Sequence, residues 1–386
     1  MKILVFNVSQ WPGQTTLPKE YTVRRAVGDR FCGVSQGVYR VANQERIHEH
    51  PANETKIEPD SFNASRYHRY EQMVAYMQSL AREYNDFVTL INLGKSYEGR
   101  DLIGLKIGRK DTNNGNKSAV LIDGGIHARE WIAPASALYI IKDMVTKYSK
   151  NDSVIGRLVD TLDWYIFPCI NPDGYEYSIR KRRYWRKTRS KQECNMGFCC
   201  FGVDANRNFG FHWGESGTSN NSCSEIYGGP DAFSEPEVQA MAEFVLANRE
   251  RIKAYFTLHS YGNMWLVPYG YKVGAKPDDF EQLSQLAREA ALKMKSVAGA
   301  TYKTEASASL YPAAGASDDW VKGEVGVKWT YTLELRPGTE EAAFKFFRVH
   351  ESKIALSGRE AMVGLVYVVS KGVLGVELTQ ERMHLL

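Results

Sequence analysis

Cysteine is scarce in this sequence, with six residues among 386, which excludes a fold held together by disulfides throughout. Four of the six nevertheless fall within one short stretch, at Cys194, Cys199, Cys200 and Cys223. Such a local cluster indicates either disulfides or a metal site. The Cys-x-x-Cys pairs typical of a structural zinc site are absent, so we favour disulfides and an oxidising, extracellular compartment.

Long apolar runs are also lacking, which excludes a membrane-spanning helix, and we expect no membrane partner. The N-terminal run Ile3–Phe6 is too short to form the core of a signal peptide. Charge is nearly balanced, and a formal net charge of +4 is too small for this length to indicate a nucleic-acid partner. We interpret the short basic run Arg180–Arg183 as a solvated face.

The remaining composition is that of a globular protein, with 43% hydrophobic and 24% charged residues. Residues 1–60 lack sustained periodicity, and we interpret them as a separate N-terminal segment, a possible truncated or divergent pro-region. Residues 61–370 form the main domain and residues 371–386 a tail. Short apolar strands are predicted at 119–123, 164–167, 255–258 and 329–335. Helices are predicted from residue 67 and at 132–148, 234–247, 279–297 and 352–368, the third opened by a capping box at Ser234 and Glu237.

This alternation predicts an α/β fold, with a mixed, twisted central β-sheet and helices on both faces. In such sheets, ligands bind where strands end and loops begin. His127 and Glu130 follow the first strand after a Gly-Gly turn, His259 follows the third, and Glu334 lies near the end of the last. Two imidazoles and a carboxylate are ligands that catalytic zinc accepts. His-x-x-Glu alone is a weak signal that a surface pair would also give, but its position after a buried strand favours a metal site.

Several separate motifs, in order, resemble those of the funnelin zinc metallocarboxypeptidases, the pancreatic carboxypeptidase A and B type. They cover about residues 62–370 and comprise Gly125-Ile-His-Ala-Arg-Glu-Trp-Ile132, Asn171-Pro-Asp-Gly174, Trp185-Arg-Lys-Thr-Arg-Ser190, Asp204-Ala-Asn-Arg-Asn208, Leu258-His-Ser-Tyr261, Tyr311-Pro-Ala-Ala-Gly-Ala-Ser-Asp-Asp-Trp320 and Glu334-Leu-Arg336. The resemblance implies a zinc carboxypeptidase-like fold for the main domain and an enzyme that shortens peptide or protein C-termini, acting as a monomer.

The resemblance also implies roles at the reacting bond. His127, Glu130 and His259 would hold one Zn²⁺ ion. Glu334 would serve as general base, taking the proton from water and delivering it to the leaving amine. Arg186 would stabilise the oxyanion.

Further residues resemble those that bind the substrate. Asn206 and Arg207 would hold the terminal carboxylate, and Tyr311 would close over it. Arg129 and Tyr261 would line the next subsite inward.

Asp318 occupies the position at the base of the pocket for the leaving side chain. A carboxylate there implies a preference for C-terminal Lys or Arg, because an unpaired buried charge disfavours apolar side chains. Gly270 and Ala306 resemble small pocket-wall positions that leave room for such a side chain. The alternative is that Asp318 is a solvated acid in a loop and that the neighbouring Asp319 is the acid with a structural role.

Cys200 and Cys223 match the positions of the family's common disulfide. Cys194 could pair with the nearby Cys199, whereas Cys169 lies in a strand-like run and is predicted to be a buried free thiol. No partner is assigned to Cys32.

Two other functions compete with a Lys- or Arg-preferring enzyme. The first is the same enzyme class with an A-type, hydrophobic or aromatic, preference. The second is a catalytically silent peptide-binding relative. The presence of all three metal ligands, Glu334 and Arg186 argues against the silent relative.

Overall fold

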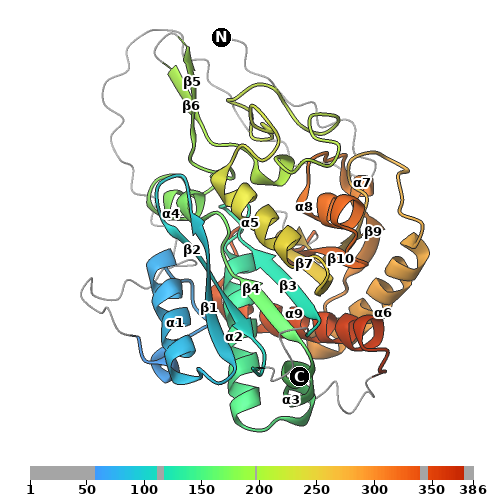
Figure 1. Ribbon diagram of the computed structural model, residues 1–386. Helices are drawn as coiled ribbons and strands as arrows, with labels where there is room; N and C mark the ends of the chain where they lie inside the picture. Colours follow the sequence, from blue (N-terminus) through green and yellow to red (C-terminus); the bar gives the residue numbers. More distant parts are fainter. Residues whose placement is uncertain (1–56, 111–116, 196–197, 340–346, 378–386) are drawn as a thin grey trace, which may run out of the picture. The chain divides into compact units, whose positions relative to one another are not determined.

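The computed structural model of the chain describes residues 57–110, 117–195, 198–339 and 347–377. A sheet runs through this part of the molecule between layers of helices (Figure 1). Its strands are β1 (Val88–Lys95), β2 (Asp101–Ile107), β3 (Ala119–Gly124), β4 (Asp163–Phe167), β7 (Ile252–Gly262), β8 (Met264–Val267), β9 (Lys303–Ala306) and β10 (Trp329–Gly338). A separate hairpin consists of β5 (Lys191–Asn195) and β6 (Phe198–Phe201).

The α-helices are α1 (Tyr70–Glu83), α2 (Ile132–Ser149), α3 (Ser153–Thr161), α4 (Pro172–Arg180), α5 (Pro236–Ala247), α6 (Phe280–Ala298), α7 (Ser307–Leu310), α8 (Ser317–Trp320) and α9 (Ile354–Val368). Shorter turns of helix are η2 (Pro59–Ser61), η3 (Ala205–Arg207), η4 (Val321–Val325), η6 (Glu351–Lys353) and η7 (Val369–Val373). The predictions for the N-terminal segment up to residue 56, for Cys32 and for the end of the tail lie outside the described residues.

The strand order in the sheet is β1-β2-β4-β3-β7-β10-β8-β9. The four central strands β4, β3, β7 and β10 run parallel, whereas β1, β2 and β8 join through antiparallel pairs. Every residue of β3 and β4 is buried, as expected for parallel strands that are covered on both faces. The carboxyl ends of the central strands therefore meet at one edge of the sheet, where ligands bind in such folds.

Alternate residues of the central strands supply two separate cores. In β3, Val120 and Ile122 face one core, while Ala119 and Leu121 face the other. Side chains of α1, α2, α3, α6 and α9 complete the first core, and those of α5 complete the second. The helices thus cover both faces of a mixed sheet, which confirms the predicted fold class (Figure 1). Within the described ranges, no helix has both the length and the apolar character needed to cross a membrane.

The predicted helices are present with ends shifted by a few residues, but the predicted capping box is wrong. The third predicted helix, α5, begins at Pro236, a residue that suits the first helical position. Ser234 Oγ instead accepts a hydrogen bond from Asn208 Nδ2 at 3.0 Å, and Glu237 Oε1 accepts one from the N–H of Tyr97 at 3.0 Å. Both side chains that the local pattern assigned to the helix cap therefore form hydrogen bonds with residues far away in the sequence.

The predicted strand ends also need correction, because β7 continues to Gly262 and β10 to Gly338. His259 consequently lies within a strand rather than after it, and Glu334 stands opposite it in the neighbouring strand.

The cysteines behave as the clustered spacing predicts. Disulfides join Cys194 to Cys199 and Cys200 to Cys223, which excludes a cysteine metal site in this stretch. Cys169 is a buried free thiol, as predicted.

Candidate metal centre and substrate pocket

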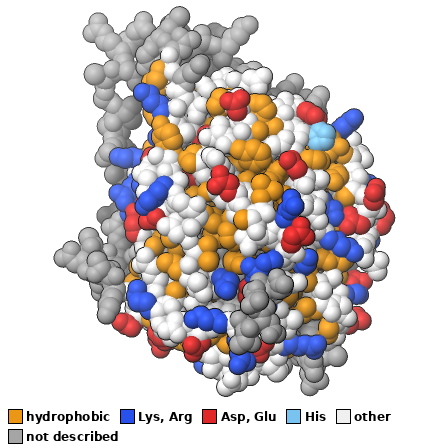
Figure 2. All heavy atoms as spheres, viewed as in Figure 1, with side chains coloured by type: hydrophobic (Ala, Val, Ile, Leu, Met, Phe, Trp, Pro, Cys, Tyr) orange, Lys and Arg blue, Asp and Glu red, His pale blue; other side chains and the backbone are white. Residues whose placement is uncertain are grey.

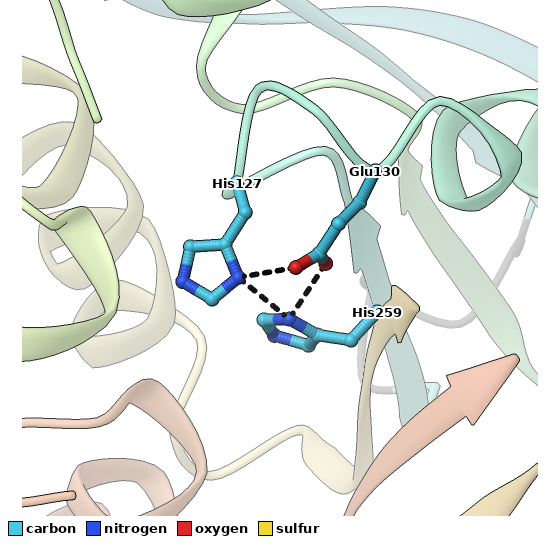
Figure 3. A group of neighbouring side chains, drawn as sticks. All are labelled: His127, Glu130 and His259. Carbon is cyan, nitrogen blue, oxygen red and sulfur yellow. Dashed lines mark hydrogen bonds and ion pairs between the residues drawn. The ribbon is translucent and has the colours of Figure 1, made fainter. Parts of the chain in front are cut away.

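Three candidate metal ligands converge at the edge where the parallel strands end. His127 Nδ1 lies 2.9 Å from Glu130 Oε1, and His259 Nδ1 lies 3.1 Å from Glu130 Oε2 (Figure 3). The Nδ1 atoms of the two histidines are 3.1 Å apart. All three side chains are buried, and one potential ligand atom of each lies within 4.8 Å of the others. The first two come from the loop between β3 and α2, and the third comes from β7.

The loop after β3 is shaped by a glycine and tied down by its neighbours. Gly125 has a φ of +67°, and a Cβ atom there would lie 3.1 Å from the Cα of Cys169, so this turn requires glycine. The N–H of Ala128 donates to the carbonyl oxygen of Arg186 at 3.0 Å. The N–H of Ser260 donates to Glu130 Oε2 at 3.1 Å. These bonds fix the direction in which the loop presents its ligands.

Asp204 orients the first histidine from behind. Its Oδ1 lies 3.2 Å from His127 Nε2, which leaves Nδ1 facing the other two ligands. Its Oδ2 accepts from Arg186 Nε at 2.9 Å, and its Oδ1 also accepts from the N–H of Asn206 at 3.1 Å. Burial alone would raise the pKa of Asp204, but Arg186 and Arg207 outweigh it and hold that pKa well below its ordinary value. Such a carboxylate fixes the ring of a metal-binding histidine and raises its basicity.

Sequence reasoning missed Asp204 as a site residue. It stands in the block Asp204–Asn208, where the resemblance assigned roles only to Asn206 and Arg207. A carboxylate two residues before a pair expected to bind substrate carries no sign that its own partner, His127, lies 77 residues away.

The donor set fits zinc. Burial, with help from Arg186, lowers the pKa of His127, which favours the neutral imidazole that a metal needs. Burial would raise the pKa of Glu130, but the two imidazoles outweigh it and lower that pKa. Burial would lower the pKa of His259, but Glu130 outweighs this effect and raises that pKa to about 9. Metal binding at His259 therefore displaces a proton. Two imidazoles and one carboxylate form one of the ligand sets that proteins use for catalytic zinc.

Glu334 lies beside these ligands in the same pocket, which His127 and His259 also line. Its Oε2 is buried and, among the described residues, has no hydrogen-bond partner. Burial raises the pKa of Glu334 to about 8, with His259 opposing the shift and Glu130 adding to it. An unpartnered carboxylate of this kind next to metal ligands can exchange a proton with a bound water.

The two adjacent acids at the start of α8 have different surroundings. Asp319 accepts from the N–H of Gly270 at 2.7 Å and from the N–H of Tyr271 at 2.8 Å, so it holds a backbone turn. Asp318 lines the pocket and is only 3% exposed, which rules out the alternative of a solvated loop acid.

The carboxylate of Asp318 is held at one oxygen. Its Oδ2 accepts from Thr332 Oγ1 at 2.9 Å and from Ser307 Oγ at 3.3 Å. Its other oxygen, Oδ1, has no hydrogen bond from the described residues and can meet a ligand. Gly270 lines this pocket as predicted, whereas Ala306 is not among its lining residues.

The residues predicted to bind a terminal carboxylate line the same pocket. Asn206 Oδ1 accepts from the N–H of Ser317 at 3.0 Å. Arg207 Nε donates to the carbonyl oxygen of Gly217 at 2.8 Å, and its Nη1 donates to that of Asn206 at 2.8 Å. Tyr311 is half exposed, with its ring centre 5.9 Å from the Arg207 guanidinium carbon. A buried cation and a half-exposed tyrosine thus line the pocket with groups that suit a carboxylate.

Arg129 and Tyr261 are not among the lining residues of this pocket, and each packs near Phe347. The Arg129 guanidinium carbon is 4.6 Å from the Phe347 ring centre, and the Tyr261 ring centre is 5.3 Å from it. Arg129 Nη1 also lies 3.2 Å from Glu225 Oε2. Phe347 had no role in the sequence analysis, because none of the motifs that carry the resemblance includes it.

Comparison with known proteins agrees with this geometry. A family model of zinc carboxypeptidases matches residues 73–364. Carboxypeptidase B of Astacus astacus is 40% identical over 305 residues, which is 79% of this chain and 96% of that protein. Zinc carboxypeptidase A 1 of Anopheles gambiae is 36% identical over 339 residues, 88% of this chain and 74% of that protein. The crystal structure of thrombin activatable fibrinolysis inhibitor (TAFI) superimposes with a TM-score of 0.76 and 38% identity, covering 82% of this chain and 77% of that one.

The family model matches most of the chain, and the matched region contains the buried group of His127, Glu130 and His259, which can bind a metal ion. The relatives include proteins named both carboxypeptidase A and carboxypeptidase B. The chain therefore belongs to the zinc carboxypeptidase family and is a zinc-dependent metallocarboxypeptidase, a hydrolase that acts on the C-termini of peptides.

Proposed function

We propose that this enzyme releases C-terminal Lys and Arg residues and that Asp318 selects them. The observation that carries the proposal is the buried Asp318 carboxylate, which lines the pocket and is held at Oδ2 by two hydroxyl groups. A cationic side chain would pair with its Oδ1, whereas an apolar side chain would leave a buried charge without a partner, at a cost of about 3 kcal/mol or more. Asp319 accepts hydrogen bonds from the backbone, so in this proposal Asp318 alone selects the terminal side chain.

The free C-terminus of the substrate would bind to Asn206, Arg207 and Tyr311. Arg207 offers a planar set of N–H donors that suits a carboxylate, and Asn206 adds an amide. The half-exposed Tyr311 at the end of α7 would cover the bound terminus and exclude water. This capture restricts cleavage to the last residue of a chain, because an internal peptide bond brings no carboxylate to Arg207.

His127, Glu130 and His259 would hold the zinc ion, and Asp204 would keep His127 in the required orientation. Zinc bound there supplies a Lewis acid beside the scissile carbonyl group. Glu334 would remove a proton from the attacking water and return it to the leaving amine as the C–N bond breaks. Arg186, held against Asp204, would donate to the developing oxyanion.

The part of the peptide before the scissile bond would run past Arg129, Tyr261 and Phe347. The side chains of Arg129 and Tyr261 each pack near the ring of Phe347. We also propose that the enzyme acts outside the cell, because its two disulfides persist in an oxidising compartment.

The test is kcat/KM on two blocked dipeptides, one ending in Arg and one in Phe, each with and without a zinc chelator. We expect a large preference for Arg, and loss of both activities on chelation. A preference for Phe would reject Asp318 as the selecting residue and leave an A-type enzyme. Activity that survives complete removal of zinc would reject the assignment of roles around His127, Glu130 and His259.

A further inference from the structure

The basic run after α4 has a position that the sequence did not suggest. Lys181 and Arg182 are exposed, and the described residues give neither of them a carboxylate partner. Nearby cations differ, since Arg180 pairs with Glu176 at 3.2 Å and Arg129 pairs with a glutamate at the same distance. Two positive charges of the basic run thus face solvent.

This segment is fastened to the loop that carries the metal ligands. Arg183 Nη1 donates to the carbonyl oxygen of Arg129 at 2.8 Å, and its Nη2 donates to that of Phe347 at 2.7 Å. Its guanidinium carbon also lies 3.7 Å from the ring centre of Trp131. In return, Arg129 Nη1 donates to the carbonyl oxygen of Tyr184 at 3.3 Å. The basic run is therefore continuous with the residues proposed to line the substrate's path.

A third cation and an aromatic ring extend the same surface. Arg348 is exposed, and its guanidinium carbon lies 5.6 Å from the ring centre of Tyr184, which is 49% exposed. We call Lys181, Arg182, Tyr184 and Arg348 the rim patch. It carries three cationic side chains, of which Lys181 and Arg182 have no carboxylate partner among the described residues.

The rim patch stands away from the specificity pocket. α4, which precedes the patch, lies on the opposite side of the view in Figure 1 from α7 and α8, which frame Asp318. In the proposed binding mode, a peptide whose last residue fills the pocket at Asp318 leaves past Arg129 and Phe347. Arg129 donates to the carbonyl oxygen of Tyr184, and Phe347 directly precedes Arg348, so both residues adjoin the patch. Upstream residues of a substrate would then reach this surface.

We propose that the rim patch binds acidic residues of the substrate upstream of the scissile bond, so that the enzyme prefers peptides with an acidic stretch before the terminal residue. This inference rests on the proposed binding mode in the pocket but not on the choice between Lys, Arg and Phe. Clustered like charges beside a cleft concentrate and steer ligands of opposite charge, and the attraction weakens as salt is added. Tyr184 adds an apolar surface for the side chains between the acids.

A peptide fits this surface better than a long polyanion does. The patch is small and adjoins the cleft, whereas basic and acidic side chains are interspersed over the face of the molecule seen in Figure 2. The whole chain also carries a net charge of only +4. A long polyanion would meet repulsion beyond the patch, while a few acidic residues of a bound peptide would not.

The test uses full-length enzyme and peptides that share the preferred terminal residue. Glu, Gln or Lys is placed about two to six positions upstream, since an extended chain advances about 3.3 Å per residue. We expect kcat/KM for the Glu peptides to exceed that for the Gln peptides by about 3- to 10-fold at low salt, with Lys peptides slowest. The variant Lys181→Gln/Arg182→Gln should lose most of this difference, and added salt should reduce it in the unaltered enzyme.

The control variant, Lys253→Gln/Lys328→Gln, removes the same charge near the other ends of β7 and β10 and should keep the difference. Equal kcat/KM for Glu, Gln and Lys peptides on the unaltered enzyme would overturn the proposal, and this comparison needs no variant to fold. A difference that the rim variant retains would also overturn it. Heparin binding that the rim variant loses, without any effect of Glu in peptides, would assign the patch to a polyanion instead.

Because the terminal residue is held constant, the test can succeed even if the enzyme turns out to prefer Phe. The comparison of blocked dipeptides, which are too short to reach the rim patch, decides the proposed role of Asp318 separately.

Discussion

Asp204 Oδ1 lies 3.2 Å from His127 Nε2, so a buried carboxylate supports a candidate zinc ligand from the side away from the metal centre. The same carboxylate holds Arg186 at 2.9 Å. One side chain thus positions both a metal ligand and the proposed oxyanion donor. Substitutions at Asp204 should therefore affect metal affinity as well as the chemical step.

Replacing Asp204 by asparagine tests this connection. Asp204→Asn keeps the size of the side chain but removes the charge, and we expect zinc affinity to fall by about 10- to 100-fold. Competition with a chromophoric chelator measures that affinity. Asp318→Asn is the matched control, because it removes a buried charge from the pocket that His127 and His259 line, without a hydrogen bond to either histidine. Equal zinc affinity in the two variants would show that Asp204 does not support the metal.

Glu334 is expected to matter for the reaction and not for metal retention. Glu334→Gln should lower kcat by at least about 100-fold, because the amide cannot accept a proton from water. Its zinc content, measured by atomic absorption, should remain at one ion per chain. Glu324→Gln, at an exposed position of η4, serves as the control for both measurements. A Glu334→Gln enzyme with nearly full kcat would remove this residue from the mechanism.

The adjacent acids Asp318 and Asp319 should give opposite phenotypes. Asp318→Asn should reduce kcat/KM for a substrate ending in Arg by about 100-fold, equivalent to about 3 kcal/mol, and spare one ending in Phe. Asp319→Asn should instead lower the free energy of unfolding by about 1–3 kcal/mol, because it weakens the bonds from Gly270 and Tyr271. Steady-state kinetics and urea unfolding separate the two effects. The assignment fails if Asp319→Asn alone changes the preference between Arg and Phe.

Glu237 should make stability depend on pH far from the active site. Burial raises its pKa to about 8, and its Oε2 lacks a partner among the described residues. The folded state then holds a proton that the unfolded state releases near pH 4.5, so the free energy of unfolding falls as pH rises from about 4.5 to about 8. The slope approaches about 1.4 kcal/mol per pH unit in that window.

Urea unfolding of Glu237→Gln at several pH values checks this expectation. The amide oxygen can still accept from the N–H of Tyr97, but it has no proton to lose, so the decline should flatten. Glu243→Gln, exposed on the same helix, should retain the decline of the unaltered protein. Identical pH profiles for the two variants would contradict the prediction.

Local patterns predicted the elements that carry the site. β3 can be predicted as a buried strand from its short apolar run alone, without knowledge of the strands that pair with it. All of its residues are buried in the structure. His127 and Glu130 follow it directly, so the turn that presents them is encoded in a few consecutive residues. The capping box failed because Ser234 and Glu237 bond to Asn208 and Tyr97, and a local pattern does not contain such partners.

The sequence by itself determined the fold class, the order of the motifs and the residue types that can hold zinc, since strand periodicity and side-chain chemistry are local properties. The resemblance assigned Asp318 to the pocket but left open that it is a solvated loop acid. Only the tertiary structure distinguished the two neighbouring aspartates, because Asp318 and Asp319 differ in the distant groups that surround them. It also placed Asp204 behind His127 and the basic run beside Arg129. These relationships depend on contacts between segments far apart in the chain, and the sheet creates them by bringing the ends of its strands together.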